Sequence, residues 1–319
     1  MDLPRARGAF GADLFTAMRA GDPTLLDPSA KPEHDEDAAI ALWALYELHY
    51  RGFDDVDARL EWDADLLRAR GALEADLETR LRSRYESPDL PDVASTDFAT
   101  AFFAFVEEHD GASLAAHVQT RADQAQVLEL LRLRSVYHLK ETDPTAWVVP
   151  RLPARAQASL VELMYDEYGT GDPRRLHAQL FADGLAACGL SADYGAYVDE
   201  APLEVLEQNN AMSLFGLHRR LRGAALGHLA AFEASSSLPS RRLVQGLQRL
   251  EMPAAMSRYY AEHVEADAVH EQLAVRTMCG SLVEEQPRLL DDVYFGAFSC
   301  LDLEDRLARR LLATWGVAA

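Results

Sequence analysis

Cysteine is scarce in this chain of 319 residues. Cys188, Cys279 and Cys300 lie far apart and form no Cys-x-x-Cys spacing. This pattern argues against a disulfide framework and a cysteine-ligated zinc site, and it is typical of a reducing cytoplasm. Long apolar runs are also missing. None approaches the roughly 20 residues that a membrane span needs, and residues 1–13 lack the apolar core of a signal peptide. We therefore expect a soluble, cytoplasmic protein with no membrane partner.

Basic residues are in deficit. The chain has 31 lysines and arginines against 52 aspartates and glutamates, so its formal net charge is −21. A chain with this excess of negative charge is repelled by phosphate backbones and by anionic lipid surfaces. The charge balance therefore argues against nucleic acid as a partner and against binding to an anionic membrane surface.

The sequence has almost none of the alternating β-branched runs that predict strands. The nearest candidate, Trp147-Val148-Val149, is cut short by Pro150. Helical spacing of apolar residues is common instead. It is clear between Asp35 and Tyr50, where Ile40 and the apolar residues after it follow an acidic start. The same periodicity predicts helices over 58–85, 97–108, 112–140, 154–168, 173–188, 202–235, 240–248, 253–279 and 287–313. The sequence thus predicts an all-α fold.

The breaks between these helices are short. Turn-forming compositions occur at residues 87–91, 143–153, 169–173 and 235–239. None of them has the length of a flexible linker, and we find no internal repeat. The default expectation is a single compact helical domain.

The most informative stretch is residues 262–270, which places His263, Asp267 and His270 at i, i+4 and i+7. At 3.6 residues per turn these three side chains share a narrow arc of one helical face. Two imidazoles and a carboxylate that point the same way suit a borderline transition metal. We therefore interpret this stretch as a candidate metal site.

A metal in a helical core takes its ligands from several helices, and carboxylates should outnumber histidines for iron or manganese. Glu233 ends a run of small and apolar residues, where a carboxylate is costly to bury unless it is paired or bound. Glu167 and His177 bracket a turn, and Glu141 is at the end of a helix or in a loop. These four residues are the further candidate ligands, with Glu162 and Asp166 as alternatives to Glu167.

The order glutamate, glutamate, histidine, glutamate and then His-x3-Asp-x2-His resembles the haem-oxygenase-like dimetal oxidases and oxygenases, the iron-containing redox enzymes. The spacing is closest to the N-oxygenating members of that family. The matching residues are the metal ligands Glu141, Glu167, His177, Glu233, His263, Asp267 and His270. No recognisable motif precedes residue 110 or so.

The resemblance implies a haem-oxygenase-like helical bundle without haem that encloses two iron ions. Residues 1–319 would form a single domain, with residues 1–110 as an N-terminal helical extension and residues 111–319 as the metal-binding core. One iron is expected at Glu167, His177 and Glu233. The other is expected at Glu141 and the three ligands of residues 263–270. The ligand types alone do not separate iron from manganese.

The resemblance further implies a nonhaem dinuclear iron oxygenase or oxidase, an oxidoreductase with O2 as co-substrate. We expect N-oxygenation of an amine in a small metabolite or amino acid, a reaction typical of biosynthesis. We expect at most one of five arginines to enter the site, where it would bind a substrate carboxylate: Arg174, Arg175, Arg219, Arg220 or Arg222. The sequence has no flavin, nicotinamide or Fe–S motif, so an external reductase or the substrate itself would supply electrons. A homodimer is compatible with the sequence.

Other readings stay open. The same dimetal site could cleave a C–C bond of an amino or fatty acid, or desaturate it. The same bundle fold also serves metal-free proteins similar to thiaminases and pyrroloquinoline-quinone synthases, and a non-catalytic binding protein is a third class. A ferritin-like site would need paired Glu-x-x-His motifs on separate helices, and the positions three residues after Glu47, Glu141 and Glu233 hold no histidine.

Overall fold

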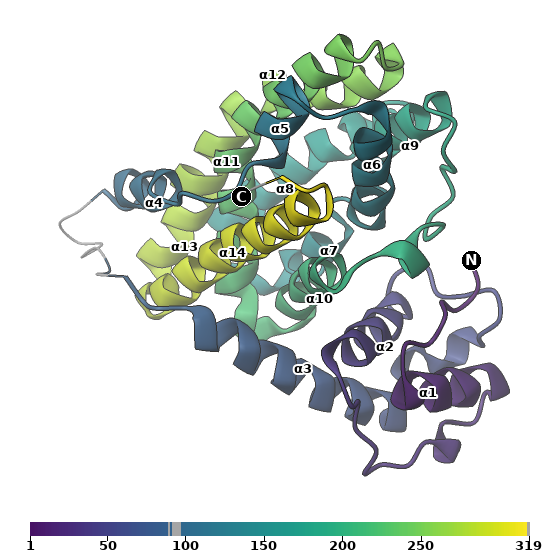
Figure 1. Cartoon of the computed structure of the whole chain (residues 1–319). Helices are drawn as coiled ribbons and strands as arrows, with labels where there is room; N and C mark the ends of the chain where they lie inside the picture. The colour runs from purple at the N-terminus through teal and green to yellow at the C-terminus, as the bar shows by residue number, and fades with distance from the viewer. Residues whose placement is uncertain (89, 91–96, 318–319) are drawn as a thin grey trace.

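The computed structural model describes residues 1–88, 90 and 97–317, except the side chains of residues 265–269. It is helical throughout, and no strand occurs in these described ranges (Figure 1). The all-α prediction is therefore confirmed. The strand candidate at residues 147–149 runs into a 3-10 turn at Val149–Arg151. None of the described helices is both long and apolar enough to cross a lipid bilayer.

The N-terminal helices gather at one end of the molecule (Figure 1). They are α1 (Ala9–Ala20), α2 (Asp35–Glu47) and α3 (Ala64–Arg84), and α4 (Phe98–Glu107) follows them. Every residue of α2 from Ala39 to Glu47 is buried, because α1, α3 and α10 all pack against this helix. A helix that is apolar on all sides must be enclosed in this way.

Ten α-helices follow α4 in the described part of the chain. They are α5 (Leu114–Thr120), α6 (Gln124–His138), α7 (Asp143–Ala146), α8 (Ala154–Glu167), α9 (His177–Ala187), α10 (Leu203–Leu217), α11 (Arg222–Arg249), α12 (Ala254–Gln272), α13 (Gly280–Glu285) and α14 (Leu290–Thr314). The long helix α11 is central, since α5, α12 and α14 all pack on it. A Cβ at Gly227 would overlap the Val293 carbonyl oxygen, and one at Gly296 would overlap that of Ala224. Both glycines therefore permit the close α11–α14 crossing.

Several predicted boundaries are wrong. The helix predicted over 112–140 is two helices, because Asp123 and Gln126 form a capping box that begins α6. The break predicted at 235–239 is absent, and α11 continues through Pro239. The helix predicted over 202–235 is instead interrupted at His218. Helix α1 was not predicted.

A π-helix follows the helix that carries the candidate metal motif. It spans Leu273–Cys279 and joins α12 to α13 without a break. The helix predicted over 253–279 is therefore present but changes its hydrogen-bond pattern after Gln272. The π-helix packs against α8 and α11, two of the elements that carry candidate ligands.

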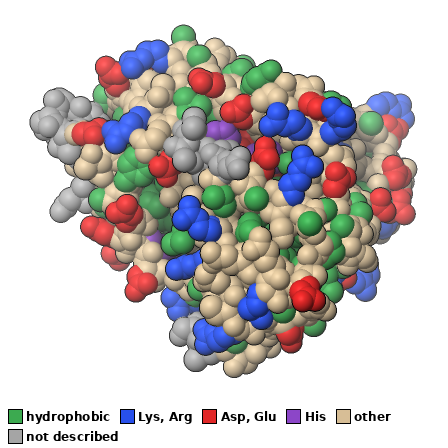
Figure 2. Space-filling model, turned by 90° about the horizontal axis from the view of Figure 1, so that it is seen from above, with side chains coloured by type: hydrophobic (Ala, Val, Ile, Leu, Met, Phe, Trp, Pro, Cys, Tyr) green, Lys and Arg blue, Asp and Glu red, His purple; other side chains and the backbone are tan. Residues whose placement is uncertain are grey.

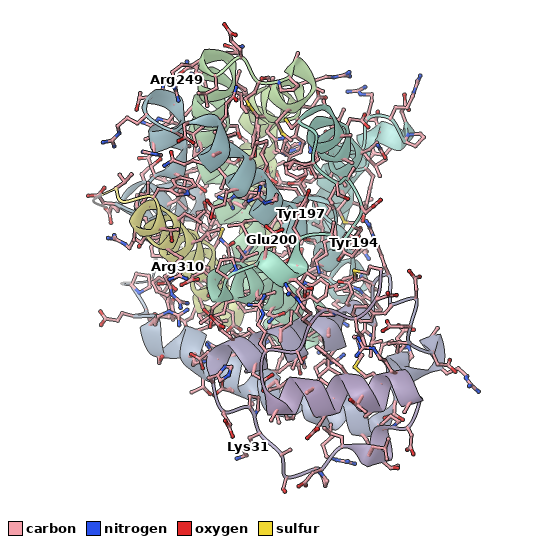
Figure 3. The ribbon with its side chains drawn as sticks, turned by 45° about the vertical axis from the view of Figure 1, so that its right-hand side comes forward. Lys31, Tyr194, Tyr197, Glu200, Arg249 and Arg310 are labelled. Carbon is pink, nitrogen blue, oxygen red and sulfur yellow. The ribbon has the colours of Figure 1, made fainter. Side chains whose placement is uncertain are left out.

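Residues 188–202, which join α9 to α10, contact the N-terminal helix α2. Tyr194 on this segment donates a hydrogen bond of 2.7 Å to Glu47 of α2, and Figure 3 shows it near Tyr197 and Glu200. Glu47 also pairs with Lys140 at 3.2 Å, and both side chains are almost completely buried.

Acidic and basic side chains are interspersed over the face seen in Figure 2.

Candidate metal centre

Six of the seven predicted ligands come together in the interior of the helical core. All six are buried, with exposed fractions between 2% and 7%: Glu141, Glu167, His177, Glu233, His263 and His270. They come from α8, α9, α11, α12 and the turn between α6 and α7. The seventh, Asp267, lies on α12, and its side chain is outside the described residues. Its role as a ligand stays a prediction.

Two turns place three of these ligands. Glu141 lies three residues beyond the end of α6, and the next residue, Thr142, has a left-handed backbone with φ of 75°. Glu167 is the last residue of α8 and His177 is the first of α9. In the loop that joins them, Gly169 has φ of 69°, and a Cβ there would meet the backbone of residues 175 and 176 at 2.6 Å. A glycine is therefore needed for the tight turn.

The ligand atoms form two overlapping sets. Glu141, Glu167, His177 and His263 each offer one atom within 4.8 Å of the others, and Glu167, Glu233 and His270 do the same. Glu167 is common to both sets, as expected of a carboxylate that bridges two ions. The sets divide the ligands differently from the sequence-based assignment, which placed His177 with Glu233 and His270 with Glu141.

Short contacts define the second set. His270 Nδ1 lies 3.5 Å from Glu167 Oε1 and 3.6 Å from Glu233 Oε2. The other ring nitrogen, Nε2, lies 3.3 Å from Asp166 Oδ2. Asp166 thus lies on the outer side of the imidazole ring. There it can accept a hydrogen bond from Nε2–H and so direct Nδ1 toward the carboxylates. Glu162 is exposed on the surface of α8, so neither alternative to Glu167 belongs to the cluster.

Two residues that we did not predict support the first set. Tyr259 donates its hydroxyl to Glu141 Oε2 at 2.9 Å, and this hydroxyl also lies 2.9 Å from His138 Nδ1. His138 Nδ1 is in turn 3.2 Å from Glu141 Oε1. The sequence did contain a signal, because Tyr259 precedes His263 by four residues and therefore shares its helical face.

The metal-free cluster is a set of charged pairs. Burial alone lowers the pKa of His263, but Glu141 outweighs this effect and raises it to about 10. His270 behaves alike: burial lowers its pKa, and Glu233 with Glu167 raises it to about 9. Burial raises the pKa of Glu141, whereas His138 and His263 together hold it well below its usual range. Without a cation, the carboxylates thus keep protons on the histidines.

The donor set fits a metal better than it fits proton sharing. The Nδ1 atoms of His177 and His270 are buried and make no hydrogen bond to any described residue, although carboxylate oxygens lie 2.9 and 3.5 Å away. A void of about 10 Å³ adjoins Glu141, Glu167, Glu233 and His263. Hard carboxylate oxygens and imidazoles of this number and kind suit iron or manganese.

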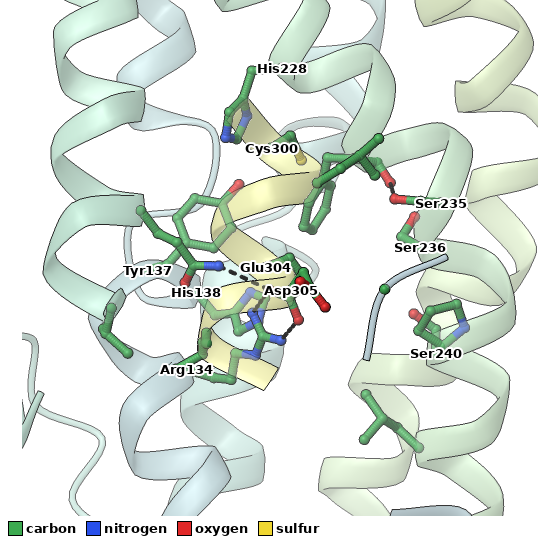
Figure 4. Close-up of a pocket in the computed structure, with 18 of the residues that line it drawn as sticks. Arg134, Tyr137, His138, His228, Ser235, Ser236, Ser240, Cys300, Glu304 and Asp305 are labelled. Carbon is green, nitrogen blue, oxygen red and sulfur yellow. Dashed lines mark hydrogen bonds and ion pairs between the residues drawn. The ribbon is translucent and has the colours of Figure 1, made fainter. Parts of the chain in front are cut away.

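A larger cavity of about 290 Å³ meets the cluster at His263. Its wall includes Tyr137, His138, Phe232 and Tyr259, and several of its residues are shown in Figure 4. Tyr137 and Phe232 also line the small void beside the carboxylates. These two rings and His263 therefore lie where the cavity adjoins the small void, and the cavity is the candidate substrate site.

The predicted substrate-binding arginines lie elsewhere. None of the five lines the cavity among the described residues. Arg174 and Arg175 are exposed and pair with Asp172 and Glu262, and Arg220 pairs with Glu78. Phe181 is buried between His138 and Tyr259, whereas Tyr165 is 57% exposed. His218 pairs with Glu74 at 2.9 Å, and neither residue belongs to the two ligand sets.

Comparisons with known proteins identify a family for this chain. Residues 128–305 match the model of the family described as iron-containing redox enzymes, and this range includes all seven predicted ligands. No curated protein matches the chain.

Among solved structures, the chain is similar to a CADD-like protein of unknown function from Nostoc punctiforme. The TM-score is 0.50 and the sequence identity is 17%, and the match covers 78% of this chain and 100% of that one. At this identity the similarity concerns the fold alone. The chain belongs to the iron-containing redox enzymes, a family with the haem-oxygenase-like helical fold.

Proposed function

We propose that this protein is a nonhaem diiron oxygenase that N-oxygenates an amine of a small metabolite or amino acid. The observation that carries the proposal is the position of Glu167, which is shared by two sets of buried carboxylate and histidine ligands. One ion would be held by Glu141, Glu167, His177 and His263. The other would be held by Glu167, Glu233 and His270, with Asp267 as a further predicted ligand.

When bound, two ferrous ions supply the electrons that activate O2. N-hydroxylation combines an amine, O2, two electrons and two protons to give a hydroxylamine and water. An external reductase would supply these two electrons, because the sequence has no motif for a bound electron carrier.

The chain's own residues prepare the site for this chemistry. The carbonyl of Tyr259 accepts a hydrogen bond from Nδ1–H of His263, which leaves Nε2 for the metal. The hydroxyl of Tyr259 donates a hydrogen bond to the Glu141 carboxylate and so orients it. Tyr137 and Phe232 line both the cavity and the small void beside the carboxylates, where they limit the entry of water.

The proposal is tested by loading the protein with ferrous iron without oxygen, adding a reductase and a panel of amines, and then admitting 18O2. The expected product carries one labelled oxygen on nitrogen, and the variant His263→Ala forms none. A labelled or shortened product with an intact amine would favour C–C cleavage, and an alkene would favour desaturation. Turnover in the complete absence of metal would favour the metal-free class of proteins.

A further inference from the structure

Each arginine, aspartate and glutamate among the described residues that line the cavity beside His263 already has a partner within the protein. Arg134 and Glu304 face each other in the wall (Figure 4) and form a two-pronged ion pair, with one contact of 2.8 Å. Gln208 donates a second hydrogen bond of 2.9 Å to Glu304. Both carboxylate oxygens and both terminal guanidinium nitrogens are thus already engaged.

The rim of the cavity follows the same pattern. Asp305 accepts a hydrogen bond of 2.6 Å from the backbone of Ala112 and pairs with Arg309 at 2.8 Å. His109 is exposed at this end of the cavity. Burial lowers the pKa of His228 to about 4, so this ring on the opposite wall is neutral at pH 7.

The cavity does contain an uncharged group without a partner. Asn209 is buried, and its Oδ1 makes no hydrogen bond to a described residue, while its Nδ2 donates to the Val205 carbonyl at 2.9 Å. The buried Ser240 adds a hydroxyl group to the same wall. A buried amide oxygen without a donor is costly. It is satisfied by a ligand that brings a neutral N–H or O–H group.

The rest of the wall is largely aromatic and aliphatic. Tyr137, Phe232, Tyr259 and Tyr260 contribute rings, and Leu133, Met212, Leu243 and Leu301 contribute alkyl groups. Rings in such a wall pack edge-to-face or offset against another ring. At about 290 Å³, the space is at the lower end of the range for small-molecule sites.

We propose that this cavity binds a small, uncharged aromatic molecule with a neutral hydrogen-bond donor, as in an arylamine, and that it disfavours zwitterionic amino acids. The inference rests on the proposed function and narrows its substrate class. The nitrogen of an arylamine is neutral at pH 7, so the ligand needs no ionic partner. To gain an ionic partner, an alkylammonium or a carboxylate would have to open the Arg134–Glu304 pair, and the other charge of the pair would then lose its partner.

The test compares three ligands on the full chain loaded with ferrous iron and kept anaerobic, so that no turnover occurs. The probes are 4-ethylaniline, its anionic analogue 4-aminophenylacetate and the zwitterion 4-amino-L-phenylalanine, and dissociation constants are measured by calorimetry. We expect 4-ethylaniline to bind about tenfold more tightly than either charged probe, because a charge without a partner is costly to bury. Equal affinities, or tighter binding of the zwitterion, would overturn the inference.

Two variants assign the binding to this cavity. Asn209→Leu removes the acceptor at similar volume and should weaken binding of 4-ethylaniline about tenfold. Ser240→Ala, a smaller change, should weaken it by a lesser factor. The control is Asn210→Leu: like Asn209, Asn210 is buried, donates through Nδ2 to a carbonyl and has an Oδ1 without a described partner, but it does not line the cavity. Wild-type affinity in both cavity variants would overturn the assignment.

The binding experiment and the oxygenation experiment fail independently. Tight binding of 4-ethylaniline without iron-dependent O2 consumption would leave the cavity assignment intact and contradict the proposed function. Iron-dependent N-oxygenation of an amino acid, with no binding of 4-ethylaniline, would support the proposed function and overturn this inference.

Discussion

His263 donates its Nδ1 proton to the backbone carbonyl of Tyr259, one helical turn earlier on α12, at 2.9 Å. A carbonyl can only accept, so this bond keeps a proton on Nδ1 and directs Nε2 at the carboxylate cluster, 3.7 Å from Glu141 Oε1, where a metal would take the place of the Nε2 proton. Tyr259 therefore orients one ligand with its backbone and another with its hydroxyl, which bonds to Glu141. The helix itself prepares the site for metal.

Removing the Tyr259 hydroxyl should weaken metal binding without removing a ligand. Tyr259→Phe loses the hydrogen bonds to Glu141 and His138, and iron affinity should fall about 10- to 100-fold, as for other residues that orient metal ligands. Competition with a ferrous chelator measures the change. The matched control is Tyr260→Phe, since Tyr260 is equally buried but is not in either ligand set. Equal affinities of the two variants would contradict a positioning role for Tyr259.

Glu167 and His270 should differ in how much metal they control. Glu167 belongs to both ligand sets and His270 to one. Glu167→Ala is therefore expected to lose both irons, whereas His270→Ala should retain about one iron per chain. Elemental analysis after desalting measures both contents. Glu162→Ala, an exposed position on the same helix, is the control and should keep the wild-type content. Equal iron content of Glu167→Ala and His270→Ala would show that Glu167 does not bridge.

The buried pair of Glu47 and Lys140 should couple the N-terminal helices to the core. The pair joins α2 to the turn that carries Glu141, and its atoms are 3.2 Å apart. Lys140→Met alone leaves the buried Glu47 carboxylate without its cationic partner. This change should destabilise the protein by about 3–5 kcal/mol. The double variant with Glu47→Leu should recover most of that loss. Chemical denaturation measures each value.

The same measurement tests whether residues 1–110 and 111–319 form one domain, as we propose. A single cooperative transition that shifts as a whole in Lys140→Met agrees with one domain. If residues 1–110 unfolded separately, the curve would show two transitions, and only one of them would move.

His228 should make stability depend on pH in mildly acidic solution. Burial lowers its pKa to about 4 in the folded protein, whereas an unfolded histidine has its ordinary value of about 6.5. The unfolded state thus binds more protons between these values, and stability falls as the pH decreases from about 6.5 to 4.

The difference between wild type and His228→Gln isolates this effect. The ring borders the cavity and is only partly shielded, so we expect a loss of about 2 kcal/mol at most. Denaturation curves at pH 7 and pH 4.5 provide the comparison. Wild-type stability that falls no more steeply than that of the variant would contradict a neutral, buried His228.

Periodicity predicted the parts of the site that lie along one helix. His263 and His270 share a face because of their spacing, and a buried glutamate among small residues indicated Glu233. The division of ligands between two sets could not be predicted. It depends on how the end of α8, the start of α9 and the middle of α12 converge, and no local pattern encodes that packing.

Local rules also failed where tertiary contacts dominate. Pro239 predicts a helix end, since it removes one backbone donor and clashes with the preceding turn. Helix α11 nevertheless continues through it, because α5, α12 and α14 enclose this helix along its length. The Arg134–Glu304 pair was not foreseen either, because its partners are 170 residues apart. Only the folded chain shows that this arginine, and none of the five proposed, lies in the cavity.

The central claim is that the buried carboxylates and histidines hold two irons that react with oxygen. The most direct measurement loads the chain anaerobically with ferrous iron, determines iron per chain, and follows visible absorption after rapid mixing with O2. We expect about two irons per chain and a transient visible band, with both lost in His263→Ala and Asp267→Ala. An absence of iron uptake would contradict the dimetal site. So would iron content and a visible band in these two variants equal to those of the wild type.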